Sequence, residues 1–176
     1  LPIYWNKMPH SGVQIKIDRG GGVTVFCGSA DIGQGSDSIL AGIVAEELGI
    51  HIQHVIIVTS DTDLTPVDLG SYSSRVTLMT GNAAIAAVRP LREKILSAAS
   101  EVMKIPEGDL TISNGEVGML DGSVEPVPFV DAVQWAEAKF GTLGSVGSYT
   151  PPRRGGEFKG AGVGPSPNYS FSACVV

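Results

Sequence analysis

Apolar and polar residues alternate near the start of the chain. Residues 13–18 read Val-Gln-Ile-Lys-Ile-Asp, three glycines follow, and residues 23–27 form a second apolar-rich run. A period of two is typical of a strand with one buried face, and glycines between two such runs favour a turn. The segment therefore predicts a β-hairpin.

The period changes after this hairpin. Apolar residues recur at helical spacing between residues 39 and 48, and Gly49 follows them as a C-terminal stop. Ser36 or Asp37 can cap the start of this helix. Residues 54–59 are largely β-branched, which predicts a buried strand. Strand, helix and strand in this order indicate one α/β crossover unit.

The second half alternates helical and extended segments. Residues 76–103 favour a helix that Pro90 should kink or split into two. Asn114-Gly115 lies between two short apolar runs and is a strong hairpin signal. Residues 129–140 predict a short amphipathic helix, residues 141–168 are turn-rich, and residues 169–176 read as a strand. The expected fold class is α+β (α/β), a mixed sheet with two to three packed helices.

Length and composition limit the classes of protein that fit. The chain has 176 residues, starts at Leu1 and is 43% hydrophobic, which suits one domain or a piece of a larger one. No apolar run approaches the ~18 residues that a membrane helix needs. The last strand stops at Val175-Val176 without a turn or polar tail, so we expect residues 1–176 to be an interior fragment of a larger subunit.

Charge argues against a nucleic-acid partner. The net charge is −6 and the sequence pI is about 4.9, whereas nucleic-acid binders usually carry a basic patch. The nearest approach to such a patch is Arg153, Arg154 and Lys159 in a Gly/Pro-rich stretch. Solvated loop charge explains these cations more simply than a phosphate site does.

The cysteines and histidines do not predict a metal site built by the protein. Cys27 and Cys174 are the only cysteines, and two thiols cannot supply the four ligands of an iron–sulfur cluster or an all-cysteine zinc site. No histidine has a cysteine at zinc-finger spacing. We expect both thiols to be free and buried on strands, which fits a reducing cytoplasm.

The first candidate site is the segment Ala30-Asp31-Ile32-Gly33-Gln34-Gly35, just before the first predicted helix. Two glycines let the backbone turn sharply and approach a ligand, and a helix start favours an anion or a polar cofactor. Gln34 would project a donor and an acceptor into the same space. The alternative is an ordinary strand-to-helix turn, and the third glycine of a dinucleotide-binding fingerprint is missing.

The second candidate site is Gly70-Ser71-Tyr72-Ser73-Ser74-Arg75, which opens the next predicted helix. Hydroxyls, an arginine and a helix N-terminus within six residues suit a phosphate or pyrophosphate. The alternative is that Ser73 or Ser74 only caps the helix, which needs a single hydroxyl.

Other polar segments give weaker signals. Residues 160–167 are rich in glycine and proline but lack a Gly-Lys-Ser/Thr sequence, so they favour a surface loop or a subunit contact over a P-loop. Asp61, Asp63 and Asp68 could pair for acid–base chemistry or bind a cation, although loop caps explain them more simply. No nucleophile–base pair is recognisable, and no catalytic residue is predicted in this chain.

Read together, the two candidate loops resemble the large subunit of the xanthine oxidase family of molybdenum hydroxylases. The resemblance rests on residues 31–35 followed by residues 61–75, and it extends through residues 139–144 to residues 160–167, nearly the whole chain. Within that family the chain most resembles the alpha, molybdenum-binding subunit of the 4-hydroxybenzoyl-CoA reductases.

The resemblance implies a cofactor and partner subunits. Dithiolene sulfurs of a pterin hold the molybdenum in this family, and bacterial members use molybdopterin cytosine dinucleotide. It places Gln34 near the molybdenum, and the serines at the pterin or dinucleotide part. The implied cofactor-binding residues are Gly33, Gln34, Gly35, Gly70, Ser71, Tyr72, Ser73 and Ser74. Iron–sulfur and FAD subunits would complete a cytoplasmic hetero-oligomer with an aromatic acyl-CoA substrate.

The chain departs from the family pattern in two respects, the first being that the family's large subunit is several times longer than this chain. The family's general-base glutamate lies in a Gly-Glu-Pro segment, and residues 115–117 and 156–158 contain the only Gly-Glu pairs, neither followed by proline. We therefore expect part of a cofactor site without its catalytic residue. The implied activity of the parent protein is reductive dehydroxylation of 4-hydroxybenzoyl-CoA to benzoyl-CoA. Alternatives are hydroxylation of an aldehyde or aromatic heterocycle, and a non-catalytic binding or assembly module.

Overall fold

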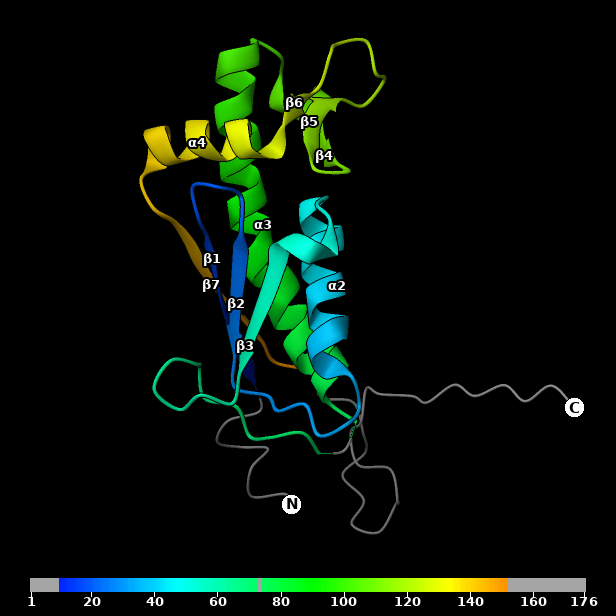
Figure 1. Ribbon diagram of the computed structural model, residues 1–176, viewed down its shortest axis with the longest axis vertical. Helices are drawn as coiled ribbons and strands as arrows, with labels where there is room; N and C mark the ends of the chain where they lie inside the picture. Colours follow the sequence, from blue (N-terminus) through cyan, green and yellow to red (C-terminus); the bar gives the residue numbers. More distant parts are fainter. Residues whose placement is uncertain (1–9, 73, 152–176) are drawn as a thin grey trace, which may run out of the picture.

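The computed structural model describes residues 10–72 and 74–151, which form two sheets and the helices packed on them (Figure 1). The strands are β1 (Ser11–Ile17), β2 (Val23–Cys27), β3 (Val55–Thr59), β4 (Leu110–Ser113), β5 (Glu116–Met119), β6 (Val127–Pro128) and β7 (Leu143–Tyr149). The helices are α2 (Ser36–Leu48), α3 (Val76–Met103) and α4 (Phe129–Phe140), with 3-10 turns η1 (Ile52–His54) and η2 (Glu107–Asp109). The expected α+β fold with a mixed sheet and packed helices is confirmed.

The main sheet has the strand order β3-β2-β1-β7. β1 and β2 form the predicted antiparallel hairpin, and β2, α2 and β3 form the predicted crossover unit, since β2 and β3 are parallel. The prediction that β3 is buried is wrong. β3 lies at the edge of the sheet and Ile56 is 63% exposed. The β-branched residues of β3 suit a strand with one buried face as well as a strand buried on both faces, so composition did not distinguish the two cases.

β7 was missed in the sequence, where residues 141–168 looked turn-rich. It pairs with the whole of β1, from Ser11 opposite Tyr149 to Ile17 opposite Leu143. Its glycines and serines have low strand propensity, yet packing requires them. The Ser145 hydroxyl donates to the backbone oxygen of Ala87 on α3, and Gly147 lies directly on the backbone of the same helix.

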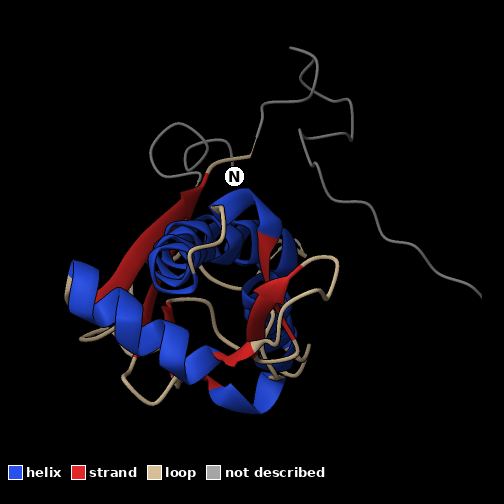
Figure 2. Cartoon of the chain, turned by 90° about the horizontal axis from the view of Figure 1, so that it is seen from above, coloured by secondary structure: helices blue, strands red, loops and turns tan. Residues whose placement is uncertain are grey.

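α3 is one continuous helix of 28 residues, so Pro90 does not split it. Pro90 is exposed, and its ring therefore displaces no packed neighbour. α3 packs against β1 and β7, and α2 and α4 pack against α3 (Figures 1 and 2). The helix is thus the element through which the sheet and the other helices are joined.

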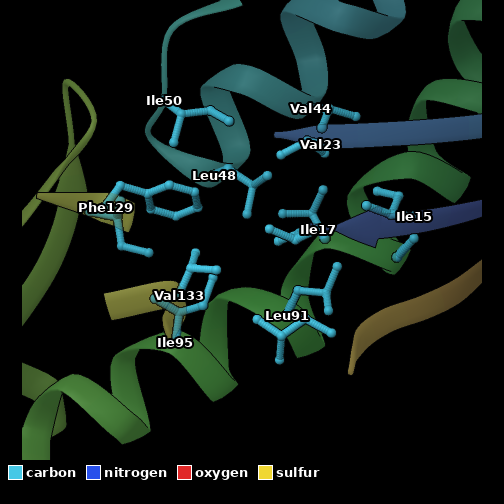
Figure 3. Packing of buried hydrophobic residues seen from close by; sticks show 14 of the residues in the cluster. Ile15, Ile17, Val23, Val44, Leu48, Ile50, Leu91, Ile95, Phe129 and Val133 are labelled. Carbon is cyan, nitrogen blue, oxygen red and sulfur yellow. The ribbon is translucent and has the colours of Figure 1, made fainter. Parts of the chain in front are cut away.

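The core lies between the main sheet and the helices, and its members come from most elements of the fold (Figure 3). Ile15 and Val23 contribute from the sheet, Leu48 from α2 and Leu91 from α3, and each is at most 1% exposed. Phe129 of α4 closes the core at the end where the small sheet lies. Burying each such side chain contributes about 1.5–3 kcal/mol before entropy is subtracted.

The small sheet has the order β4-β5-β6, and it contacts the C-terminal end of α2, where the Gly115 N–H donates to the Gly49 oxygen at 2.9 Å. Asn114 and Gly115 both have positive φ, as the predicted two-residue hairpin turn requires. Gly49 ends α2 with φ +75°, as expected, and a Cβ there would lie 2.1 Å from the Ile112 oxygen. The predicted helix over residues 129–140 is confirmed as α4.

Several predictions fall outside the described residues: the strand over residues 169–176, the segment 160–167, Cys174, Arg153, Arg154 and Lys159. Within the described residues, no helix combines the length and apolar character needed to cross a membrane.

The contact between β7 and α3 gives a first test. A Cβ at Gly147 would lie 2.2 Å from the Ala83 oxygen and 2.4 Å from the Ala87 nitrogen. Gly147→Ala must push strand and helix apart, so we expect the free energy of unfolding to fall by about 2 kcal/mol or more. Denaturant titration of the purified protein measures this loss.

Gly144→Ala on the same strand is the control, because its Cβ would meet only the Ile15 oxygen at 3.5 Å. We expect a change within about 0.5 kcal/mol. Equal losses in the two variants would contradict the close packing of β7 on α3.

Candidate functional site

Both candidate loops lie at the same end of the main sheet. Residues 28–35 follow β2 and residues 60–75 follow β3, and these two strands are parallel. Loops at the carboxyl ends of parallel strands are the usual place for a ligand in such units. Figure 1 shows this loop end at the bottom of the molecule, while α4 and the small sheet lie at the other end.

The Gly-Gln-Gly loop is organised by Asp31. Its Oδ1 accepts the backbone N–H of Gly33 at 2.9 Å and of Gly35 at 3.3 Å, and its Oδ2 accepts that of Asp37 at 3.3 Å. These backbone bonds, that of Gly33 first, lower the pKa of Asp31. The Asp31 carboxylate therefore occupies the backbone N–H groups at the start of α2, where the sequence predicted an anion or a polar cofactor.

The prediction that Ser36 or Asp37 caps α2 is wrong. Gly35 is the N-cap residue, with φ +74°, and it has no side chain to offer. Asp37 lies in the first turn, where its Oδ2 accepts the Thr59 hydroxyl at 3.5 Å and its Oδ1 is buried with no hydrogen-bond partner in the part of the chain that the structure describes. Burial and the neighbouring charge of Asp31 raise the pKa of Asp37. The two carboxyls of this loop thus have opposite pKa shifts.

Gln34 is exposed, but its amide turns back over its own loop. Its Oε1 accepts the Ile32 N–H at 2.6 Å, and its Nε2 donates to the Ala30 oxygen and to the Ser36 hydroxyl, both at 3.0 Å. The sequence suggested an amide projecting toward a ligand. The structure instead shows an amide whose donor and acceptor atoms are already engaged.

Ser71 joins the two loops. Its hydroxyl donates to the Ala30 oxygen at 2.5 Å and accepts the Ala30 N–H at 3.2 Å. The structure therefore brings the two predicted segments together, as a shared site requires. Tyr72 is 40% exposed and Ser74 is exposed with φ +50°, while Ser73 lies outside the described residues.

A buried ion pair holds the second loop. Arg75 Nη1 lies 2.9 Å from Asp68 Oδ1 and 3.1 Å from the Gly70 oxygen, and Nη2 donates to the Ser11 hydroxyl at 3.2 Å. The Arg75 guanidinium also lies 5.3 Å from the centre of the Tyr72 ring. Since the guanidinium is occupied inside the protein, the prediction that it contributes to an anion site is wrong.

A serine does not occupy the N-cap position of α3, and Ser73, one of the two serines considered as a cap, lies outside the described residues. The helix begins at Val76, and Arg75 is its N-cap residue, with no side-chain cap hydrogen bond. The backbone N–H of Arg75 instead donates to the Tyr72 oxygen at 3.3 Å. The loop reaches the helix through a backbone turn.

Three glycines leave open space at the loop end. Gly33, Gly35 and Gly70 have φ of +102°, +74° and +104°, and a Cβ on any of them would meet no atom of residues 10–72 and 74–151 within 4 Å. Gly28 differs, because a Cβ there would lie 2.2 Å from the Pro66 oxygen. Gly28 is required by packing of the two loops, whereas the other three glycines expose backbone that a ligand can approach. This arrangement fits a polar organic cofactor.

The aspartates of the loop end do not form a metal-binding cluster among the described residues. Among residues 10–72 and 74–151, no three His, Cys, Asp or Glu side chains are grouped so that they could hold a metal ion. Cys27 is free and buried, as expected, and burial raises the pKa of its thiol to about 11. Asp61 caps its own loop by accepting the N–H groups of Asp63 and Leu64, which confirms the simpler explanation of that residue.

Asp31 and Asp68 lie in segments that the sequence singled out but were not predicted to organise the two loops, and Ser11 was not singled out at all. A signal for the first two exists in the sequence, because both begin an Asp-X-Gly triplet. In each triplet the aspartate accepts the glycine N–H, at 2.9 Å for Asp31 and 2.8 Å for Asp68. No local pattern points to Ser11, which is 64 residues from Arg75.

Comparisons with known proteins agree with this geometry. A family model described as the molybdopterin cofactor-binding domain matches residues 2–176. The gamma subunit of the 6-hydroxypseudooxynicotine dehydrogenase complex of Paenarthrobacter nicotinovorans is 43% identical over 101 residues, covering 57% of this chain and 13% of that protein. A protein of Escherichia coli strain K12 named "Probable hypoxanthine oxidase" is 36% identical over 140 residues, covering 78% of this chain and 14% of that protein.

A solved structure shares the fold. Quinoline 2-oxidoreductase from Pseudomonas putida 86 superposes with a TM-score of 0.72 at 29% identity, over 81% of this chain and 19% of that one. The chain thus spans less than a fifth of the length of the relatives named here.

The opposite pKa shifts of Asp31 and Asp37 generate a test. A lowered pKa means that ionised Asp31 stabilises the fold above its unfolded pKa, and that this contribution is lost as pH falls. A raised pKa means that ionised Asp37 destabilises the fold as pH rises above the unfolded value. At pH 7 we expect Asp31→Asn to lower the unfolding midpoint and Asp37→Asn to raise it.

Thermal unfolding of the purified protein at pH 7 and at about pH 3 checks both signs. At the lower pH the Asp37 carboxyl is largely protonated, so Asp37→Asn should approach the wild type. The loss caused by Asp31→Asn should become smaller as the pH falls towards the lowered pKa of Asp31. Shifts of the same sign at pH 7 would contradict the assigned electrostatics.

Proposed function

The chain belongs to the molybdopterin cofactor-binding domain family of xanthine oxidase-type oxidoreductases, and on this premise we propose that its two loops form one wall of a molybdenum cofactor site. The observation that carries the proposal is the Ser71–Ala30 contact. It joins the two loops at the carboxyl ends of β2 and β3, next to three glycines with open space in front of them.

The proposed cofactor-binding residues keep distinct roles. Gly33, Gly35 and Gly70 expose backbone, Gln34 offers an amide, and Tyr72 offers a half-exposed ring and hydroxyl. Ser73 and Ser74 complete the set implied by the resemblance, which also includes Ser71, the residue that joins the two loops. When bound, the cofactor supplies the redox chemistry, and this chain contributes orientation and hydrogen bonding.

For Gln34 to bind the cofactor, its amide has to exchange partners. Its Nε2 donates to the Ala30 oxygen and to the Ser36 hydroxyl, and its Oε1 accepts the Ile32 N–H. Because the side chain is exposed, a change of its rotamer can release these bonds without moving the core. The same amide then has one donor and one acceptor group for a polar ligand.

We favour hydroxylation of an aromatic heterocycle as the reaction of the whole protein. The relatives named above have names that refer to a nicotine derivative, hypoxanthine and quinoline, which all contain nitrogen heterocycles. Reductive dehydroxylation of 4-hydroxybenzoyl-CoA remains a prediction from the resemblance. A non-catalytic module remains an alternative with less support, because the relatives are named as oxidoreductases.

The rest of the assembly is proposed on the same basis. The cofactor would be molybdopterin cytosine dinucleotide, and partner subunits with iron–sulfur clusters and FAD would carry electrons. The name of one relative, a subunit of a dehydrogenase complex, supports a hetero-oligomer. We expect this complex in the cytoplasm.

Metal and pterin analysis of the full-length complex tests the proposal. We expect molybdenum and molybdopterin in equal amounts per large subunit. Gln34→Ala should lower turnover roughly 10- to 100-fold, because it removes a group that orients the cofactor, and it should leave the unfolding midpoint unchanged.

Gln53→Ala is the matched control, since Gln53 is equally exposed but precedes β3 at the other end of the sheet. It should behave as the wild type. A wild-type complex without molybdenum would overturn the proposed function, and normal turnover in Gln34→Ala would remove Gln34 from the site.

A further inference from the structure

The only proton of the Ser71 hydroxyl is used within the protein. A hydroxyl has one proton, and that of Ser71 is donated to the Ala30 oxygen at 2.5 Å. The same oxygen atom accepts the Ala30 N–H at 3.2 Å. The backbone N–H and the backbone oxygen of Ala30 in the first loop are therefore both bonded to the Ser71 side chain of the second loop.

Ser71 and Gln34 converge on the same atom. The Ala30 carbonyl oxygen accepts the Ser71 hydroxyl at 2.5 Å and the Gln34 amide at 3.0 Å. A carbonyl oxygen has two lone pairs, so these two donors fill its capacity. The position of the Ala30 peptide, and with it the resting position of the Gln34 amide, depends on Ser71.

Ser71 itself is held by the buried ion pair. The residue before it, Gly70, donates its N–H to Asp68 at 2.8 Å and accepts a bond from Arg75 through its oxygen at 3.1 Å. Asp68 also accepts the Ser11 hydroxyl at 2.5 Å. The side chains of Asp68 and Arg75 are 2% and 10% exposed, so water competes little for these bonds.

From these contacts we propose that Ser71 is a positioning residue that holds the Ala30 peptide and thereby the Gln34 amide, rather than a ligand of the cofactor. The proposal deepens the proposed function and rests on it for the role of Gln34. The placement of the loop by Ser71 is independent of any cofactor.

Amide hydrogen exchange tests the placement directly. Full-length complex purified from cells grown without molybdate is compared as wild type, Ser71→Ala, Ser71→Thr and Ser123→Ala. In Ser71→Ala we expect exchange within residues 30–37 to rise roughly tenfold, because two bonds to Ala30 are lost. Ser71→Thr keeps the hydroxyl and should restore protection.

Two internal controls show whether the effect is local. Ser123 is an exposed serine next to the small sheet, and Ser123→Ala should leave residues 30–37 unchanged. Exchange in α3 should be the same in all variants, which excludes general unfolding. Unchanged exchange at residues 30–37 in Ser71→Ala, or failure of Ser71→Thr to restore it while α3 stays protected, would overturn the proposal.

A double-mutant cycle separates positioning from direct binding. In complexes from molybdate-grown cells, the molybdenum content of Ser71→Ala/Gln34→Ala should match that of Gln34→Ala alone, because Ser71 acts through Gln34. Additive losses would mean that Ser71 contacts the cofactor itself and would overturn the proposal. A wild-type complex without molybdenum would refute the proposed function instead, and the exchange result would still decide whether Ser71 holds the loop.

Discussion

The buried pair of Asp68 and Arg75 is the interaction on which the candidate site depends. The pair also binds a distant part of the chain, because the Ser11 hydroxyl on β1 donates to Asp68 and accepts from Arg75. Removing one charge of such a pair leaves the other buried without compensation, which typically costs about 3–5 kcal/mol. The pair therefore fixes the loop after β3 against the main sheet, and every contact of Ser71 follows from that placement.

The crossover unit places the second loop beside the first. Parallel pairing of β2 with β3 brings the carboxyl ends of both strands to the same end of the sheet. The absence of a side chain at Gly28 lets the two loops that follow these strands touch. A Cβ at Gly28 would lie 2.9 Å from the Asp68 nitrogen, next to the ion pair itself. The same two features, a parallel strand pair and a glycine at the contact, therefore bring Ser71 within reach of Ala30.

Local signals in the sequence predicted the elements that local interactions decide. The first hairpin, the α2 stop at Gly49, the Asn114-Gly115 turn and α4 each carry a pattern within a few residues. β7 was missed because its glycines and serines suit the backbone of α3, a neighbour that no local window contains. The two loops were found from their glycines and hydroxyls. Of the two side chains that Arg75 binds, Ser11 could not be found from the sequence because it lies 64 residues away, whereas Asp68 is only 7 residues away.

The start of α2 also limits which part of a ligand can bind there. The Asp31 carboxylate already accepts three backbone N–H groups of residues 33–37, so the partial positive charge of the helix end is compensated within the chain. A phosphate at the same place would have to displace a carboxylate and would be repelled by it. The Gly-Gln-Gly loop therefore suits a neutral hydrogen-bonding part of a cofactor, and an anionic part has to be bound away from the start of α2.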